Sequence, residues 1–346
     1  MAFIATEGFD SYVASAGADD VGLVWSTVGT GADFTFETGR HGIGQCIRML
    51  AGATTLSLPM ANVADVKVAF SYKIEGLPGF AKSMFEVIEN STYHCGFDLQ
   101  SNGAVTAVRY DLSHVPTILA SSPKLLRTDT WYTFKLLITI GNSISADSFI
   151  LLVNDEEWLN VPATSDTQNN GFGLANSFVF GLGGTIRSID DFYMMDAADP
   201  WPDEHRVDTI RPNAIGTTND WLGSDADSVD NHLHVDEVTP DGDTTYVESS
   251  TVGQIDLYNL ESLPIIPIEI YCANTCSICK KTDAGSRTVK HIARTGGANF
   301  EGALTHYPSA VSYSRQANPY TLNPDTGVKW VQADIDALQS GLKIES

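Results

Sequence analysis

The sequence has no long apolar run, little basic charge and few cysteines. Its 346 residues contain no uninterrupted apolar stretch near the roughly 18 residues that a bilayer-spanning helix needs, so we expect no membrane insertion. The opening residues, MAFIATEGFDSY, show neither the basic nor the apolar region of a signal peptide. We therefore expect synthesis and retention in a cytoplasm, unless a larger assembly carries the protein out.

The shortage of basic charge argues against one class of partner. Lysine and arginine number 20 against 43 acidic residues, which gives a net charge of −23. Proteins that bind nucleic acid use a basic stripe against the phosphate backbone, so we expect no nucleic-acid partner. The segment from Asp190 to Glu261 holds 18 acidic residues and two arginines. Such a surface favours solubility; docking to a basic partner and calcium binding are the alternatives.

Five cysteines are too few, and their number is odd, for the disulfide framework of a small secreted protein. Three of them form the sequence CANTCSIC, where Cys272, Cys276 and Cys279 have C-x3-C-x2-C spacing. Radical enzymes that use S-adenosylmethionine hold an iron–sulfur cluster with this spacing. Those enzymes need on the order of 200 further residues to complete a barrel, but only 67 follow Cys279 (346 minus 279).

The three clustered cysteines therefore have several interpretations. An extended strand would place Cys272 and Cys276 on one face, about 13 Å apart, and Cys279 on the other face, which suits neither chelation nor a disulfide. Zinc would need a fourth ligand, which His291 or His306 could supply. We expect unligated thiols, no metal and no cofactor; a disulfide within or between chains, zinc and iron–sulfur remain as alternatives.

Helical periodicity is scarce before residue 200, and strand patterns dominate. In VADVKVAFSYKI the side chains of Val66, Val68, Phe70 and Tyr72 alternate onto one face. The segments WYTFKLLITI, DSFILLVND, SFVFGLGG and SIDDFYMMD repeat such patterns. In the last of these we expect Phe192 to point inward and the acids to start the strand. Short strands between Gly-, Asn- and Asp-rich turns predict an all-β sandwich or jelly roll.

A change in composition divides the chain. The prolines and acids of DAADPWPDEHR indicate a linker. We predict a jelly roll at 1–197, a linker at 198–204, and an acidic, loop-rich β module at 205–346.

One short helix is expected near the C-terminus. The segment from Lys329 to Ser340 places Trp330, Ile335 and Leu338 on one side and ends before a glycine. The following LKIES would form a last strand.

Several short motifs occur in an order that resembles a known family. In the first half these are GFDSY, GRHGIGQCIRM, DTWYTFKLLITI and SIDDFYMMD. In the second half they are RVDTIRPNAIGTTNDW, PDGDTTYVESSTVGQIDLY, KKTDAGSRTVKHIARTGG and NPDTGVKWVQADIDALQSGLK. Together they resemble tailed-bacteriophage virion structural proteins in which a concanavalin/laminin-G-like jelly roll precedes a C-terminal β module.

This resemblance implies a non-enzymatic structural component of a virion, made in the cytoplasm of a bacterial host. Its partners would be copies of itself and other virion proteins, in a minor tail, collar, fibre or head-decoration position. The alternative is a lectin-like module of the particle that binds a host-surface glycan. The fold alone does not decide between them.

The sequence contains little that supports a catalytic site or a calcium site. Glycoside hydrolysis needs two carboxylates facing one sugar, and no E-x-D-x-x-E string occurs. Glu86 and Glu89, three residues apart, would lie on opposite faces of a strand, so we expect no enzyme.

The pair His232 and His234 would share a face of an extended segment, and we expect exposed loop residues there. The following acids are expected to be solvated turn residues and not calcium ligands: Asp225, Asp227, Asp230, Asp241 and Asp243.

Overall fold

The computed structural model describes ten segments of the chain and places them in two compact units. The sandwich unit comprises Ile4–Trp201 with His205–Val207, and the C-terminal unit consists mainly of Asp208–Ser346. No helix in the described part of the chain is long and apolar enough to span a bilayer. The described residues are 3–9, 26–28, 34–51, 55–141, 149–162, 165–169, 173–181, 184–202, 205–238 and 240–346.

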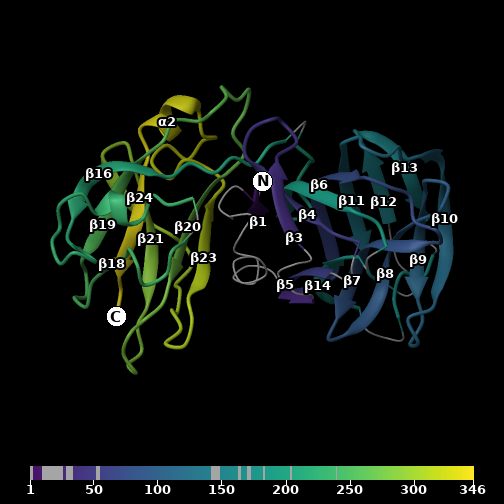
Figure 1. The fold of residues 1–346 in the computed structure, drawn as a ribbon, viewed down its shortest axis with the longest axis horizontal. Helices are drawn as coiled ribbons and strands as arrows, with labels where there is room; N and C mark the ends of the chain where they lie inside the picture. Colours follow the sequence, from purple (N-terminus) through teal and green to yellow (C-terminus); the bar gives the residue numbers. More distant parts are fainter. Residues whose placement is uncertain are drawn as a thin grey trace. The chain divides into compact units, whose positions relative to one another are not determined.

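Two large antiparallel sheets form the sandwich unit (Figure 1). Sheet A has the order β13 (Glu156–Val161), β12 (Phe149–Val153), β11 (Tyr132–Thr139), β6 (Asp65–Ile74), β15 (Arg187–Met195), β4 (Gln45–Met49), β3 (Phe34–Thr38), and β1 (Phe3–Glu7) also pairs with β15. Sheet B has the order β10 (Pro116–Leu125), β9 (Ala104–Tyr110), β8 (Thr92–Leu99), β7 (Lys82–Glu89), β14 (Ala175–Phe180), β5 (Thr55–Val63), β2 (Ser26–Val28). The chain crosses between the two sheets several times, with β7–β10 consecutive in one sheet and β11–β13 consecutive in the other, and the arrangement is a jelly-roll β-sandwich.

Phenylalanine side chains join the two sheets in the core. Phe70 of sheet A stacks on Phe134 at 5.5 Å between ring centroids and meets Phe180 of sheet B edge-on at 4.7 Å. Such pairs contribute beyond the free energy of burying their area. The predicted alternation in β6 is confirmed, because all four side chains expected on one face are buried in this core: Val66, Val68, Phe70 and Tyr72.

The C-terminal unit is built on a five-stranded antiparallel sheet (Figure 1). Trp330 is 2% exposed, and its indole N–H donates to the carbonyl of Tyr320 at 2.8 Å. The order of the sheet is β16 (Pro212–Asn219), β19 (Ile255–Leu260), β24 (Gln339–Ile344), β21 (Val289–Thr295), β22 (Ala298–Glu301), and two pairs accompany it, β17 (Leu222–Gly223) with β18 (Val247–Glu248) and β20 (Ala273–Cys279) with β23 (Ser314–Tyr320).

The predicted C-terminal helix exists but is shorter than expected. Helix α2 spans Gln332–Asp336, whereas the sequence predicted a helix from Lys329 to Ser340. From Gln339 the chain pairs with β19 and β21 in the middle of the sheet. These ladder hydrogen bonds override the helical pattern of the last residues.

The position of the acids in SIDDFYMMD was predicted wrongly. Phe192 does point into the core, as expected. Asp190 and Asp191 lie in the middle of β15, where the pairing with β6 shifts register. Asp191 has a φ of 50°, so the chain forms a bulge that the alternation of side chains does not reveal.

Candidate functional site

The cysteine cluster lies on a regular strand. The predicted extended segment is confirmed as β20, which begins just after Cys272 and ends at Cys279. The five cysteines of the chain, all in described segments, are free thiols, and Cys276 is exposed. Burial raises the pKa of Cys272 to about 12 and that of Cys279 to about 11. These two thiols are therefore protonated at neutral pH and are poor nucleophiles.

No three His, Cys, Asp or Glu side chains within the described ranges lie close enough together to hold a metal ion. His291 and His306, the proposed fourth zinc ligands, lie next to each other with ring centroids 4.8 Å apart. His291 Nε2 lies 3.1 Å from the Ser277 hydroxyl. The expectation of no metal site at Cys272, Cys276 and Cys279 stays a prediction.

The acidic loop of the C-terminal unit consists of turns. Asp225 and Asp227 each accept a hydrogen bond from the backbone N–H two residues later, which is ordinary turn chemistry. His232 and His234 lie in a 3-10 helix, Asn231–His234, and not in the extended segment that the sequence suggested. The Asp230 conformation, with a φ of 59°, starts that helix.

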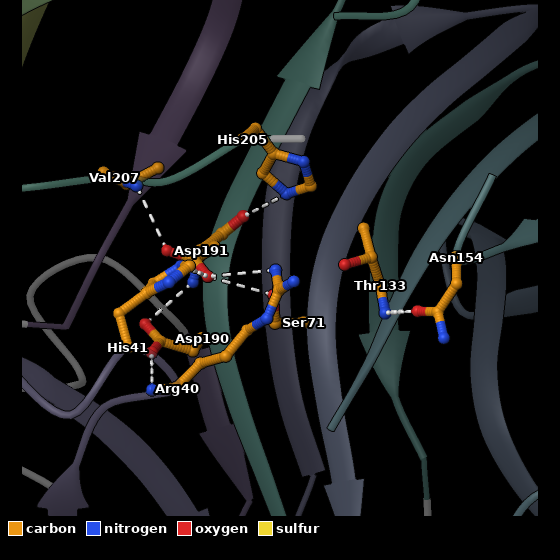
Figure 2. Close-up of polar contacts among 9 residues, drawn as sticks. All are labelled: Arg40, His41, Ser71, Thr133, Asn154, Asp190, Asp191, His205 and Val207. Atoms are coloured by element: carbon orange, nitrogen blue, oxygen red, sulfur yellow. Dashed lines mark hydrogen bonds and ion pairs between the residues drawn. The ribbon is translucent and has the colours of Figure 1, made fainter. Parts of the chain in front are cut away.

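Asp191 is the centre of a buried polar network on the face of sheet A that points away from the core (Figure 2). Its carboxylate accepts hydrogen bonds from the Ser71 hydroxyl at 3.0 Å and from the Val207 N–H at 3.1 Å. Arg40 Nη1 lies 3.7 Å and His41 Nε2 lies 3.3 Å from the same carboxylate. Asp191 is 1% exposed, so this carboxylate is desolvated and compensated by several donors.

The same network attaches the last residues of the sandwich unit, His205–Val207, to sheet A. His205 Nε2 donates to the carbonyl of Asp191 at 3.1 Å, and the Arg40 N–H donates to Asp190 at 2.7 Å. Burial lowers the pKa of His205 to about 4, so its ring is neutral at pH 7. Because the Asp191 carboxylate is compensated by several groups inside the protein, we assign the network a structural role.

A second group of polar side chains lies on the outer face of sheet B. Phe85 and Val87 of β7 and Phe97 of β8 point into the core. Because side chains alternate along a strand, Glu86 and Asp98 point to the opposite face. Both carboxylates are nevertheless buried, at 1% and 6% exposed.

Three rings surround these carboxylates and complete what we call the outer-face cluster: Glu86, Tyr93, Asp98, Tyr110 and His114. His114 Nε2 lies 3.0 Å from Glu86 Oε1, and the Tyr110 hydroxyl donates to Asp98 Oδ1 at 3.2 Å. The His114 ring stacks on Tyr93 with centroids 3.7 Å apart and lies 4.6 Å from Tyr110. The imidazole thus occupies a box of two aromatic rings and one carboxylate.

A strained turn presents His114 to this box. Asp111 Oδ1 accepts the N–H groups of Ser113 at 2.8 Å and of Val115 at 2.9 Å. His114 itself has a φ of 59°, a left-handed conformation that is uncommon for residues with a side chain, although histidine adopts it more often than most. The turn 111–115 therefore holds its own shape and extends one side chain towards the sheet.

Burial and pairing perturb the titration of the cluster. Burial raises the pKa of Asp98 to about 6, although the Tyr110 hydroxyl works to lower it. The hydrogen bond to Glu86 raises the pKa of His114. Desolvated carboxylates are costly unless they are paired, and groups with perturbed pKa values concentrate at functional sites. Chemically, the cluster offers carboxylate acceptors for ligand hydroxyls or amines and aromatic faces for a ring.

Sequence reasoning missed this cluster. Glu86 was weighed only against Glu89, three residues away in the same strand, and not against Asp98. The two carboxylates come together because β7 pairs with β8 in a register that places Gly96 opposite Glu86. The sequence signal that could have found the cluster is that each acid occupies an outward-facing position in a strand of alternating pattern.

Comparison with known proteins adds little beyond this geometry. No protein-family model matches the chain, and no curated protein sequence matches it. Among solved structures it is similar to the carbohydrate-binding module CBM66 from Bacillus subtilis (11% identity, 50% of this chain and 95% of that chain, TM-score 0.35). It is also similar to a PL-14 alginate lyase from Aplysia kurodai (7% identity, 56% and 99%, TM-score 0.44). A third similar structure is the alginate lyase Aly36B (13% identity, 58% and 98%, TM-score 0.42). Since these TM-scores are below 0.5, we base the fold on the sheet order alone.

Proposed function

We propose that the chain is a non-enzymatic, glycan-binding component of a bacteriophage particle, and that the sandwich unit binds a saccharide with the outer-face cluster. The observation that carries the proposal is the gathering of two buried carboxylates and three rings on a sheet face that points away from the core. The core does not require these groups, and burying charges there opposes folding. The virion context comes from the order of sequence motifs in both halves of the chain.

The chemistry of the cluster suits a sugar. Carboxylate oxygens accept hydrogen bonds from hydroxyl groups, and charged acceptors form the stronger bonds. Tyrosine rings offer flat apolar faces next to polar tips, which matches the mixed surface of a pyranose. Binding sites of this kind combine apolar walls with a few precisely placed polar groups.

A glycan array tests this function. We expect the purified chain to bind a defined set of saccharides, and the double variant Glu86→Gln/Asp98→Asn to bind them at least about tenfold more weakly, a change of about 1.4 kcal/mol. Glu157→Gln, an exposed acid on β13 of the other sheet, is the matched control and should bind as the natural chain does.

Two outcomes would count against the proposal. If no saccharide binds, or if the double variant binds as well as the control, the outer-face cluster is not a glycan site. If the bound glycan is cleaved during incubation, with new reducing ends or unsaturated products, the protein is an enzyme and the non-enzymatic part of the proposal is wrong.

A purely structural role in the virion is the second candidate. The observation that favours it is an apolar segment of the C-terminal unit in which Ile265, Ile266 and Ile268 are 51%, 76% and 107% exposed. Exposed apolar residues in one place often mark contacts with other proteins.

Light scattering tests the structural role. We expect a defined oligomer of the natural chain and dissociation when Ile265, Ile266 and Ile268 are all replaced by serine. The triple replacement Val229→Ser/Val252→Ser/Val311→Ser, at other exposed positions, is the control. If the natural chain is monomeric at every concentration, the hypothesis of self-association through this segment is wrong.

A further inference from the structure

His114 occupies the outer-face cluster in the manner of a ligand. Its ring is enclosed by the rings of Tyr93 and Tyr110, and its Nε2 meets the Glu86 carboxylate. Tyr93 and Tyr110 also contact each other edge-on, with centroids 6.1 Å apart. Two aromatic rings with a carboxylate form the environment that recognises an organic cation, by cation–π attraction and ion pairing together.

We propose that the His114 imidazole holds the place of a ligand's amino group, and that the turn 111–115 is a gate which an amino-sugar glycan displaces. This inference rests on the proposed glycan-binding function and specifies its ligand. The ligand class is a saccharide with a free amine, whose ammonium group would pair with Glu86 between the two tyrosine rings.

The turn has the properties of a movable element. Its shape is held by its own hydrogen bonds: Asp111 Oδ1 accepts from the N–H groups of Ser113 and Val115, and the His114 N–H donates to the Asp111 carbonyl at 2.9 Å. Leu112 and Val115 are 70% and 54% exposed, so little apolar surface fastens the turn to the sheet.

The charges around the box select against acidic sugars. Glu86 and Asp98 both face it, Asp111 lies at the base of the turn, and no basic side chain in the described residues is hydrogen bonded to either buried carboxylate except His114. A uronic or sialic acid placed there would meet two carboxylates, and like charges in a desolvated site repel strongly. An amine reverses the sign of that interaction.

Calorimetric titration with two probes tests the gate: fully deacetylated chitohexaose and fully acetylated chitohexaose. We expect the natural chain to prefer the deacetylated probe. His114→Ala should bind it more tightly, on the order of tenfold, because the site no longer spends most of its time closed. His114→Phe, which keeps a ring in the box, should bind no more tightly than the natural chain. Leu112→Ala, in the same turn, is the control and should bind as the natural chain does.

The outcomes separate this inference from the function on which it rests. If the natural chain binds both probes equally, the amine specificity is wrong. If His114→Ala binds no more tightly than the natural chain in a folded protein, the gate is wrong. In both cases glycan binding stands. If neither probe binds but the array shows other saccharides, the amine specificity is wrong. If nothing binds at all, the proposed function fails first.

Discussion

Replacing Asp191 with alanine is expected to lower the free energy of unfolding of the sandwich unit by about 3–5 kcal/mol, because it removes one partner from a buried charged network. Without the carboxylate, the Ser71 hydroxyl and the Val207 N–H lose their acceptor, and Arg40 keeps a charge beside a desolvated face. Burial works to raise the pKa of Asp191, but the nearby His41 ring and the hydrogen bond from the Val207 N–H help to outweigh it and lower that pKa.

Hydrogen exchange of the amides in β6 and β15 is the measurement, because it reports the opening of each unit separately. Asp191→Asn separates charge from shape, since asparagine tolerates a positive φ and still accepts hydrogen bonds; we expect a smaller loss than for alanine. Asp65→Asn is the control, because Asp65 is exposed and accepts a hydrogen bond from the Thr139 hydroxyl at 2.7 Å. If Asp191→Ala opens no more readily than the Asp65 variant, the network does not stabilise the fold.

Acidification is expected to destabilise the C-terminal unit through His291. Burial, together with the neighbouring His306 and Arg315, lowers the pKa of His291 to about 3. The folded state therefore keeps this ring neutral, while the unfolded state binds a proton below the ordinary histidine pKa of about 6.5. The stability that His291 contributes is complete above about pH 6.5 and is lost as the pH falls towards 3. Between pH 6.5 and 4 the loss is about 3 kcal/mol.

The pH dependence of His291→Gln isolates this effect. Glutamine can still bond the Ser277 hydroxyl, which lies 3.1 Å from His291 Nε2, but it does not titrate. Asp256 lies in the same unit with a pKa that burial raises, and it acts in the opposite direction on acidification. Both proteins contain Asp256, so subtracting the pH dependence of the variant's stability from that of the natural chain removes the contribution of Asp256.

We expect the exchange of β21 amides, corrected for the intrinsic chemical rate, to accelerate on acidification in the natural chain and much less in His291→Gln. His232→Gln, in the 3-10 helix, is the matched control and should follow the natural chain. Equal pH dependence in all three proteins would show that His291 is not buried as a neutral ring.

The sequence was sufficient for those parts of the fold that depend on local alternation. The β6 pattern placed Phe70 and Tyr72 in the core correctly, because burial on one face requires a period of two. Trp330, Ile335 and Leu338 were recognised as one apolar side and are buried together. The all-β class and the strand at the C-terminus followed from the same reasoning.

The candidate site depends on pairing between distant strands, which local patterns do not encode. Glu86 and Asp98 share a face only because of the register between β7 and β8. His114 reaches them through a turn with a positive φ, and Asp191 points outward because of a bulge. Each of these is an exception to regular geometry, and such exceptions concentrate where function or strain overrides local preference.

The order of strands in sheet A also determines how this protein can fold during translation. β15 lies between β6 and β4, so Asp190 pairs with Ser71, which the ribosome made 119 residues earlier (190 minus 71). At 5–20 residues per second the earlier strand waits roughly 6 to 24 s for its neighbour. During that interval β4 and β6 expose unpaired edges, which invite association with other chains. We therefore expect chaperones to bind a nascent chain that ends before Arg187, and the sandwich to close only when its last strands have left the ribosome.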